Sequence, residues 1–202
     1  MKKKYEVRDA AVASNGFFKL NRYRLRHSSF HGGWCAEIER ERLEQLAAVS
    51  VLLYDPLLDM LVLVEQFRIG LMDSTDPPWS IETVSGFCDK AHENAETVAR
   101  REVVEETGCE LKALTPIGEF YVSPGMSVER INLYCGWVDA GLADGVHGLE
   151  HEGEEMRVVT LPRTQAVDQL FRQLNTTSIV IALQWLEAHR DELLEDWGFA
   201  DP

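Results

Sequence analysis

The sequence predicts a mixed α/β (α+β) fold, in which a β-sheet is combined with helices and is preceded by a β-rich extension. Two apolar runs rich in β-branched residues, Ala47–Tyr54 and Met60–Phe67, predict neighbouring strands. Apolar residues with a helical period predict helices at Ala95–Thr107 and Thr177–Leu194. The order of these strands and helices along the chain is typical of a mixed α/β domain.

The N-terminal part of the chain, residues 1–45, is the predicted extension. Apolar and charged side chains alternate partly here, as at Phe18, Leu20 and Tyr23. This alternation predicts two or three strands with one solvated face. We therefore divide the chain into this extension and a main domain, residues 46–202, with no low-complexity linker between them.

The main domain begins with a predicted hairpin, because Asp55–Asp59 joins the two apolar runs as a short turn. The segment Asp73–Trp79 contains consecutive prolines, which exclude a helix and predict a loop. A single short strand, Ile81–Ser85, then leads to Gly86. The helix after it is bounded by Asn94, a favourable N-cap.

The second half of the main domain contains three more predicted strands and two more helices. Gly108 provides the left-handed residue that ends the preceding helix. An acidic, glycine-containing loop covers residues 139–155, and Pro162 begins the next helix. The expected strands are Pro116–Val122, Ile131–Val138 and Met156–Leu161. The apolar face of the last helix consists of Ile179, Ala182, Leu183 and Leu186.

Composition excludes several classes of protein. A net charge of −14 repels nucleic acid and anionic membrane surfaces, so we expect neither as a partner. No apolar run follows the initial Met-Lys-Lys-Lys, and no stretch reaches the roughly 18 apolar residues of a transmembrane helix. The cysteines contain no C-x-x-C pair, which argues against zinc and disulfides and favours a reducing cytoplasm. They are Cys35, Cys88, Cys109 and Cys135.

The helix Ala95–Thr107 carries the most informative residues, a group of three glutamates. Glu102 and Glu106 are spaced i, i+4, and Glu105 shares their side of the helix. The apolar stripe of the helix continues through Glu102 and Glu106, so we expect both to point toward the core. Buried carboxylates need compensation, and magnesium coordinated by oxygen ligands provides it.

A solvated acidic face is the alternative interpretation, since the whole chain is acidic. Arg101 argues for a built site, because it lies i, i+4 from Glu105 and can hold this carboxylate in a bidentate pair. We therefore expect Arg101 to orient a glutamate and not to bind metal.

These residues also carry a family resemblance. The pattern Glu93-x7-Arg101-Glu102-Val103-x-Glu105-Glu106-x-Gly108 resembles the Nudix box, a highly specific signature. Two positions depart from the family pattern. Six residues separate Gly86 from Glu93, one more than in the family, and Cys109 stands where an aliphatic residue is usual. The extra residue affects the loop before the helix and leaves the helix carboxylates in place.

The resemblance covers nearly the whole chain and is greatest to the bacterial Nudix enzymes that cleave ADP-ribose, the ADP-ribose pyrophosphatases. It implies a Nudix fold, a mixed sheet between helices, and a homodimer that exchanges its N-terminal strands. The implied reaction is the Mg²⁺-dependent hydrolysis of ADP-ribose to AMP and ribose 5-phosphate. The matching segments are Asn15–Phe18, Val64–Ile69, Pro78–Trp79, Ser123–Gly125 with Glu129–Arg130, His147–Val158 and Ser178–Leu186.

The resemblance also implies roles for individual residues. Two or more Mg²⁺ ions, or Mn²⁺ instead, would be held by the Ser85 carbonyl, Glu102, Glu106 and Glu154, with Glu105 as a further ligand or bound through water. Glu152 would be the general base. The substrate, a small nucleotide sugar, would be bound by Phe17, Arg40, Arg68, Ser123 and Glu129.

Simpler interpretations exist for several of these residues. Phe17 and Phe18 could be core strand residues, and Arg68 could be a surface partner of Glu65. The acids at 150–155 could be a solvated run of charge. Two other functions also remain open: hydrolysis of another nucleotide sugar such as GDP-mannose, and a catalytically idle domain that binds ADP-ribose. The presence of all the expected glutamates argues against an idle domain.

Overall fold

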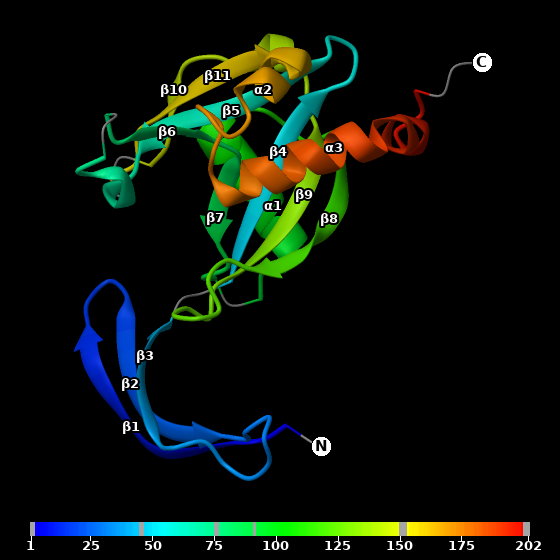
Figure 1. Ribbon diagram of the computed structural model, residues 1–202. Helices are drawn as coiled ribbons and strands as arrows, with labels where there is room; N and C mark the ends of the chain where they lie inside the picture. Colours follow the sequence, from blue (N-terminus) through cyan, green and yellow to red (C-terminus); the bar gives the residue numbers. More distant parts are fainter. Residues whose placement is uncertain (1–2, 45–46, 75–76, 91, 150–152, 200–202) are drawn as a thin grey trace. The chain divides into compact units, whose positions relative to one another are not determined.

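The computed structural model describes residues 3–44, 47–74, 77–90, 92–149 and 153–199 (Figure 1). The chain forms two compact units. The first comprises residues 1–47 together with 121–130, and the second comprises residues 48–120 and 131–202. The segment 121–130 therefore belongs with the N-terminal residues, a grouping that the sequence pattern does not reveal.

The N-terminal unit is built on an antiparallel sheet of three strands, β1 (Tyr5–Asn15), β2 (Lys19–His27) and β3 (Ile38–Glu44). Every residue of these strands is exposed or half-buried, and Tyr5 and Val12 are among the exposed apolar side chains. The strands predicted for this part of the sequence are thus confirmed, but within one chain they enclose no core of their own.

In its described residues, the second unit contains a mixed eight-stranded sheet and three α-helices. Its strands are β4 (Ala48–Asp55), β5 (Met60–Phe67), β6 (Trp79–Glu82), β7 (Val84–Phe87), β8 (Ala113–Tyr121), β9 (Arg130–Trp137), β10 (Val146–His147) and β11 (Met156–Pro162). Its helices are α1 (Ala95–Thr107), α2 (Arg163–Gln169) and α3 (Thr177–Asp196), with short 3₁₀ turns η1 (Ile69–Leu71) and η2 (Ala140–Leu142).

Strand β4 lies at the centre of this sheet and is buried along its whole length. It runs antiparallel to β5 and β7 and parallel to β9. Its side chains alternate between two cores, because successive residues of a strand point to opposite faces. Val51 packs in the core that includes α1, and Leu52 packs in the core that includes α3 (Figure 1). The predicted fold, a mixed sheet between helices, is therefore confirmed.

The structure corrects the sequence prediction at the segment leading to Gly86. We expected one strand, Ile81–Ser85, but two strands separated by Thr83 occupy this region. β6 pairs with β5, whereas β7 pairs with β4. The Thr83 hydroxyl lies 2.7 Å from the Ser50 hydroxyl in a buried hydrogen bond. The break arises because the segment leaves one partner strand and joins another, which no local pattern encodes.

The loop predicted at 139–155 also contains short regular elements, η2 and β10. Asp55, at the end of β4, anchors its beginning by accepting a hydrogen bond from the Ala140 amide at 2.9 Å. β10 pairs with β11, with His147 opposite Met156. The last helix extends to Asp196, and the four apolar residues expected on its buried face are all buried.

Asp59 connects the β4–β5 turn to two helices. Its carboxylate accepts hydrogen bonds from Arg163 Nε at 2.7 Å and from the Tyr54 hydroxyl at 2.8 Å. Arg190 of α3 donates to the same hydroxyl at 2.9 Å. Burial alone raises the pKa of Asp59, but the bonds from Arg163 and Tyr54 outweigh it and lower this pKa.

None of the helices within the described residues is long and apolar enough to cross a membrane.

Candidate active site

Helix α1 forms where the sequence predicts it, and both of its ends are capped as expected. The Asn94 side chain accepts a hydrogen bond from the Thr97 amide at 2.8 Å. Gly108 adopts the left-handed conformation, with φ of 68°, and its amide bonds to the Val104 carbonyl. These caps fix the helix locally, so the positions of its glutamates follow from the helical repeat.

The packed face of α1 carries the predicted pair of acids. Glu102 is 9% exposed and Glu106 is 2% exposed, alongside Val98 and Ala99 at 0%. Burial raises the pKa of Glu102 to about 7, although the charge of Arg101 opposes this shift. Burial and the nearby charge of Glu102 raise the pKa of Glu106 well above its ordinary value. The solvated-face interpretation is therefore wrong for these two glutamates.

The backbone of β7 lies directly against this acid pair. A Cβ atom on Gly86 would fall 2.1 Å from the carboxyl carbon of Glu102, closer than any real contact. The Ser85 amide donates a hydrogen bond to Glu106 Oε2 at 3.3 Å. Glycine at position 86 thus leaves the Glu102 carboxylate the space that it occupies against the strand. The strand residue expected to offer its carbonyl to a metal, Ser85, lies beside Glu106.

Arg101 contacts Glu105, as the i, i+4 spacing suggests, but through one nitrogen and not in the expected bidentate pair. Its Nη1 atom lies 2.9 Å from Glu105 Oε2 and 2.8 Å from Glu102 Oε1. Its Nη2 atom lies 3.4 Å from Glu93 Oε2. One half-buried guanidinium therefore connects three glutamates of the sequence motif. Glu105 is held by this cation at the edge of the cluster, with 27% of its side chain exposed.

Arg68 pairs with a residue that the sequence analysis did not select. Its Nη2 and Nε atoms lie 2.8 and 3.1 Å from Glu82 Oε2. The surface pairing with Glu65 is wrong, because Glu65 accepts a hydrogen bond from Arg157 at 2.8 Å. The sequence signal that could have identified Glu82 is its charge, since it lies among strand residues that lead to Gly86.

The loop between β10 and β11 approaches the helix from another side. The Gly148 amide bonds to the Glu105 carbonyl at 3.3 Å, and the Glu154 amide bonds to the Leu149 carbonyl at 3.2 Å. The charge of Glu154 contributes to the raised pKa of both Glu102 and Glu106. Glu154 therefore lies within electrostatic reach of the acid pair. Glu152, the expected base, lies outside the described residues, as does His151.

The remaining predicted substrate residues belong to the N-terminal unit. Phe17 lies in the β1–β2 turn, 88% exposed, and contacts Phe18 edge-to-face with ring centroids 4.8 Å apart. The core-strand interpretation of Phe17 is therefore wrong. Arg40 donates to the Glu39 carbonyl, and Ser123 accepts from the Met126 amide within a turn. Burial raises the pKa of Glu129.

The chemistry of the donors fits a hard divalent cation. Glu102 and Glu106 are buried carboxylates with raised pKa values, and such a pair is stabilised by a nearby cation. Within the described ranges, no group of three or more His, Cys, Asp or Glu side chains is arranged to hold a metal ion. The carboxylates of the described part thus form a pair with Glu154 nearby, and the Ser85 amide donates a hydrogen bond to one of them.

Two of the cysteines near this site are packing residues. Cys109 is buried within the core beneath α1, and Cys88 packs against that core. His147 bonds through Nε2 to the Asp144 carbonyl at 2.7 Å.

The site thus consists of a mixed sheet between helices, with a capped helix that presents buried glutamates to a glycine-containing strand. Comparison with known proteins gives the class of protein to which this arrangement belongs. The NUDIX domain family matches residues 44–181, so the chain belongs to the Nudix family of hydrolases.

Comparison with individual relatives is more specific than the family match. The chain is 41% identical over 184 residues to an ADP-ribose pyrophosphatase of Escherichia coli (strain K12), covering 91% of this chain and 88% of the relative. An ADP-ribose pyrophosphatase of Haemophilus influenzae is 40% identical over 196 residues, which are 95% of this chain and 90% of the relative. A GDP-mannose pyrophosphatase of Cronobacter sakazakii is 30% identical over 186 residues, 90% of this chain and 93% of the relative.

A solved structure supports the fold assignment. The crystal structure of an ADP compounds hydrolase superposes with a TM-score of 0.72 at 20% identity, covering 98% of this chain and 97% of that one. At this identity the likeness establishes the fold alone.

Proposed function

We propose that this Nudix hydrolase cleaves the pyrophosphate bond of ADP-ribose, producing AMP and ribose 5-phosphate, with Mg²⁺ as its cofactor. The observation that carries the proposal is the buried pair Glu102 and Glu106 held against Gly86. The choice of ADP-ribose is supported by relatives of that name at 40–41% identity, compared with 30% for a GDP-mannose pyrophosphatase.

The proposed metal ligands are Glu102, Glu106, the Ser85 carbonyl and Glu154, with Glu105 as a further ligand or bound through water. When bound, Mg²⁺ supplies positive charge that neutralises the diphosphate oxygens and favours attack by water. We propose two or more ions, for which Mn²⁺ is an alternative. The raised pKa values of the pair favour this assignment, because an uncompensated buried carboxylate tends to take up a proton instead.

The protein contributes orientation and proton transfer. Arg101 holds Glu105 and Glu102 through its Nη1 atom, so the carboxylates keep a constant arrangement. Arg68 offers a planar cation to the diphosphate. Glu152 is proposed as the base that takes a proton from the attacking water. Gly148 and Gly153 both have positive φ, a backbone conformation that favours glycine over other residues.

The N-terminal unit is proposed to bind the rest of the substrate. Phe17 presents an exposed ring suited to stacking on adenine, and Arg40, Ser123 and Glu129 provide polar contacts. We propose that the unit acts in a homodimer with exchanged N-terminal strands. The exposure of Phe17, Tyr5 and other apolar side chains supports this proposal, because such surfaces on a sheet without its own core are expected to be covered.

The remaining assignments follow from charge and thiol chemistry. The chain's charge of −14 favours a small-molecule substrate and argues against nucleic acid and membrane surfaces as partners. A cytoplasmic location fits the free thiols of the four cysteines.

A substrate panel tests the proposed function. Purified protein would be incubated with Mg²⁺ and ADP-ribose, GDP-mannose, UDP-glucose or a nucleoside triphosphate, and the products separated by chromatography. We expect the highest kcat/KM for ADP-ribose, with AMP and ribose 5-phosphate as products. A higher value for GDP-mannose would establish the second candidate function, and binding of ADP-ribose without products would establish an idle domain.

Light scattering tests the oligomeric state. We expect a dimer at assay concentration, and removal of residues 1–45 should abolish adenine binding. An active monomer would contradict the dimer proposal without affecting the choice of substrate.

A further inference from the structure

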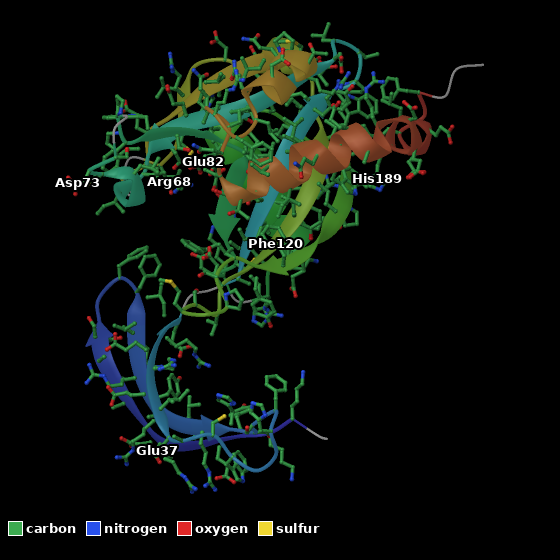
Figure 2. The ribbon with its side chains drawn as sticks, viewed as in Figure 1. Glu37, Arg68, Asp73, Glu82, Phe120 and His189 are labelled. Atoms are coloured by element: carbon green, nitrogen blue, oxygen red, sulfur yellow. The ribbon has the colours of Figure 1, made fainter. Side chains whose placement is uncertain are left out.

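The Arg68–Glu82 pair lies at the edge of the candidate active site and involves a carboxylate with unusual burial. Glu82 is the last residue of β6, opposite Val64 in β5, and only 8% of it is exposed. Arg68 directly follows β5, and its backbone amide bonds to the Pro78 carbonyl at 2.8 Å. Both residues are labelled in Figure 2.

The contact between the two side chains is a forked one. Arg68 Nη2 lies 2.8 Å from Glu82 Oε2, while Arg68 Nε lies 3.1 Å from the same oxygen and 3.3 Å from Oε1. Two adjacent donors of the guanidinium are therefore engaged by one carboxylate. Such a fork fixes the plane of the guanidinium as well as its position.

The acids of the candidate site also interact electrostatically with Arg68. Burial alone lowers the pKa of Arg68, but the bond and charge of Glu82 raise it, and the charges of Glu106 and Glu154 raise it further. Glu106 and Glu154 are thus competitors of Glu82 for the same cation. A guanidinium that pairs with them neutralises oxygens that a divalent metal requires.

We propose that Glu82 is a positioning residue with two effects: it holds the Arg68 guanidinium toward the substrate diphosphate, and it keeps this cation from neutralising the metal-binding acids. The proposal rests on the proposed function, because Arg68 and the acids take their roles from it. Its physical basis is the choice of the carboxylate with which Arg68 pairs. As long as Glu82 satisfies two donors of Arg68, this guanidinium is engaged and does not pair with Glu106, whose oxygens a metal needs.

The position of Glu82 in the chain explains how it can have this role. Glu82 precedes the break at Thr83, and β7 begins immediately after it and carries Ser85 and Gly86. The same short segment therefore holds the arginine through Glu82 and meets the acid pair through the Ser85 amide. The spacing between cation and acids is set by one continuous piece of backbone.

A purely structural role for the pair predicts a different result. If Glu82 and Arg68 only join β5 to β6, then Glu82→Gln lowers the melting temperature and leaves metal affinity in the folded protein unchanged. If Glu82 positions Arg68, the variant loses metal affinity and substrate affinity while it remains folded. Metal affinity without substrate separates these two interpretations, because it requires no turnover.

The experiment measures Mn²⁺ binding by electron paramagnetic resonance on the full-length protein without substrate, together with KM and kcat for ADP-ribose. Glu82→Gln keeps the size of the side chain and removes its charge. We expect Mn²⁺ affinity to fall about tenfold and KM to rise about tenfold, the effect of one charge-assisted hydrogen bond, with a smaller change in kcat. Glu65→Gln is the matched control, because Glu65 also pairs with an arginine beside β5 and should change neither quantity.

A second variant tests the competition directly. Adding Arg68→Met to Glu82→Gln removes the released cation, so Mn²⁺ affinity should recover while KM stays high. Wild-type affinity in Glu82→Gln, or no recovery in the double variant, would overturn the inference and leave the proposed function standing. A wild-type protein that binds no Mn²⁺ and cleaves no nucleotide sugar would overturn both.

Discussion

Gly86→Ala is the substitution whose effect follows most directly from the structure. The added Cβ atom would lie 2.1 Å from both Cδ and Oε1 of Glu102 and 2.5 Å from its Cγ. Gly86 has no positive φ, so its backbone accepts alanine without strain. The atoms in the way form the end of a flexible side chain, and we therefore expect the carboxylate to move while the strand stays in place.

The size of this movement determines the expected loss of activity. Ordinary contact begins at 3.4 Å, so the Glu102 carboxyl group must retreat by about 1.3 Å from its 2.1 Å position. A displacement of about 1 Å in an active site costs up to about 100-fold in rate, or about 2.7 kcal/mol. We therefore expect kcat for ADP-ribose to fall about 100-fold, with a higher Mg²⁺ concentration needed for half-maximal rate.

Gly118→Ala is the matched control, because a Cβ at this strand position meets nothing within 4 Å. Steady-state kinetics over a range of Mg²⁺ concentrations and thermal melts would be measured for both variants. We expect the melting temperature of Gly86→Ala to stay within a few degrees of wild type, since about 1 kcal/mol shifts it by about 2–4 °C in a chain of this size. Wild-type kcat and Mg²⁺ dependence in Gly86→Ala would refute the idea that the position of the Glu102 carboxylate controls the reaction.

Three further predictions concern other carboxylates. Glu102→Gln and Glu106→Gln should each lower kcat and raise the Mg²⁺ concentration that the enzyme requires. Because both residues act on one metal cluster, the double variant should be less than additively worse. Near-normal rates at low Mg²⁺ in titrations of either single variant would contradict this. Glu152→Gln should lower kcat by about 10²–10⁴-fold with little change in Mg²⁺ or substrate affinity. The activity of Glu154→Gln should instead be partly restored by excess Mg²⁺. Unchanged single-turnover rates in Glu152→Gln would place the base elsewhere. The lowered pKa of Asp59 means that its ionised form stabilises the fold above the ordinary Asp pKa of about 3.9 and that this stabilisation is lost as pH falls through the lower folded value. Asp59→Asn should therefore lower the melting temperature at pH 7 and approach wild type in acid, and a difference independent of pH in thermal melts would argue against an ionic role.

Sequence patterns predicted the local elements of this chain well. Helix α1 has the predicted bounds, with Asn94 and Gly108 as its caps, because capping and helical period depend on residues a few positions apart. The same period placed Glu102 and Glu106 on the packed face of the helix. Strand pairing was less accessible, as the division of β6 from β7 at Thr83 shows. The segment is predicted as one short strand from its sequence, and only its two partner strands reveal the break.

The sequence by itself determined the family, the helix that carries the acids and the types of residue suited to a metal. Only the tertiary structure decided how these residues are partnered. It pairs Arg68 with Glu82 instead of Glu65, and it brings Gly86 so close to Glu102 that no side chain fits between them. Helix and cap signals arise from neighbours along the chain, whereas burial, raised pKa values and ion pairs arise where segments distant in sequence meet.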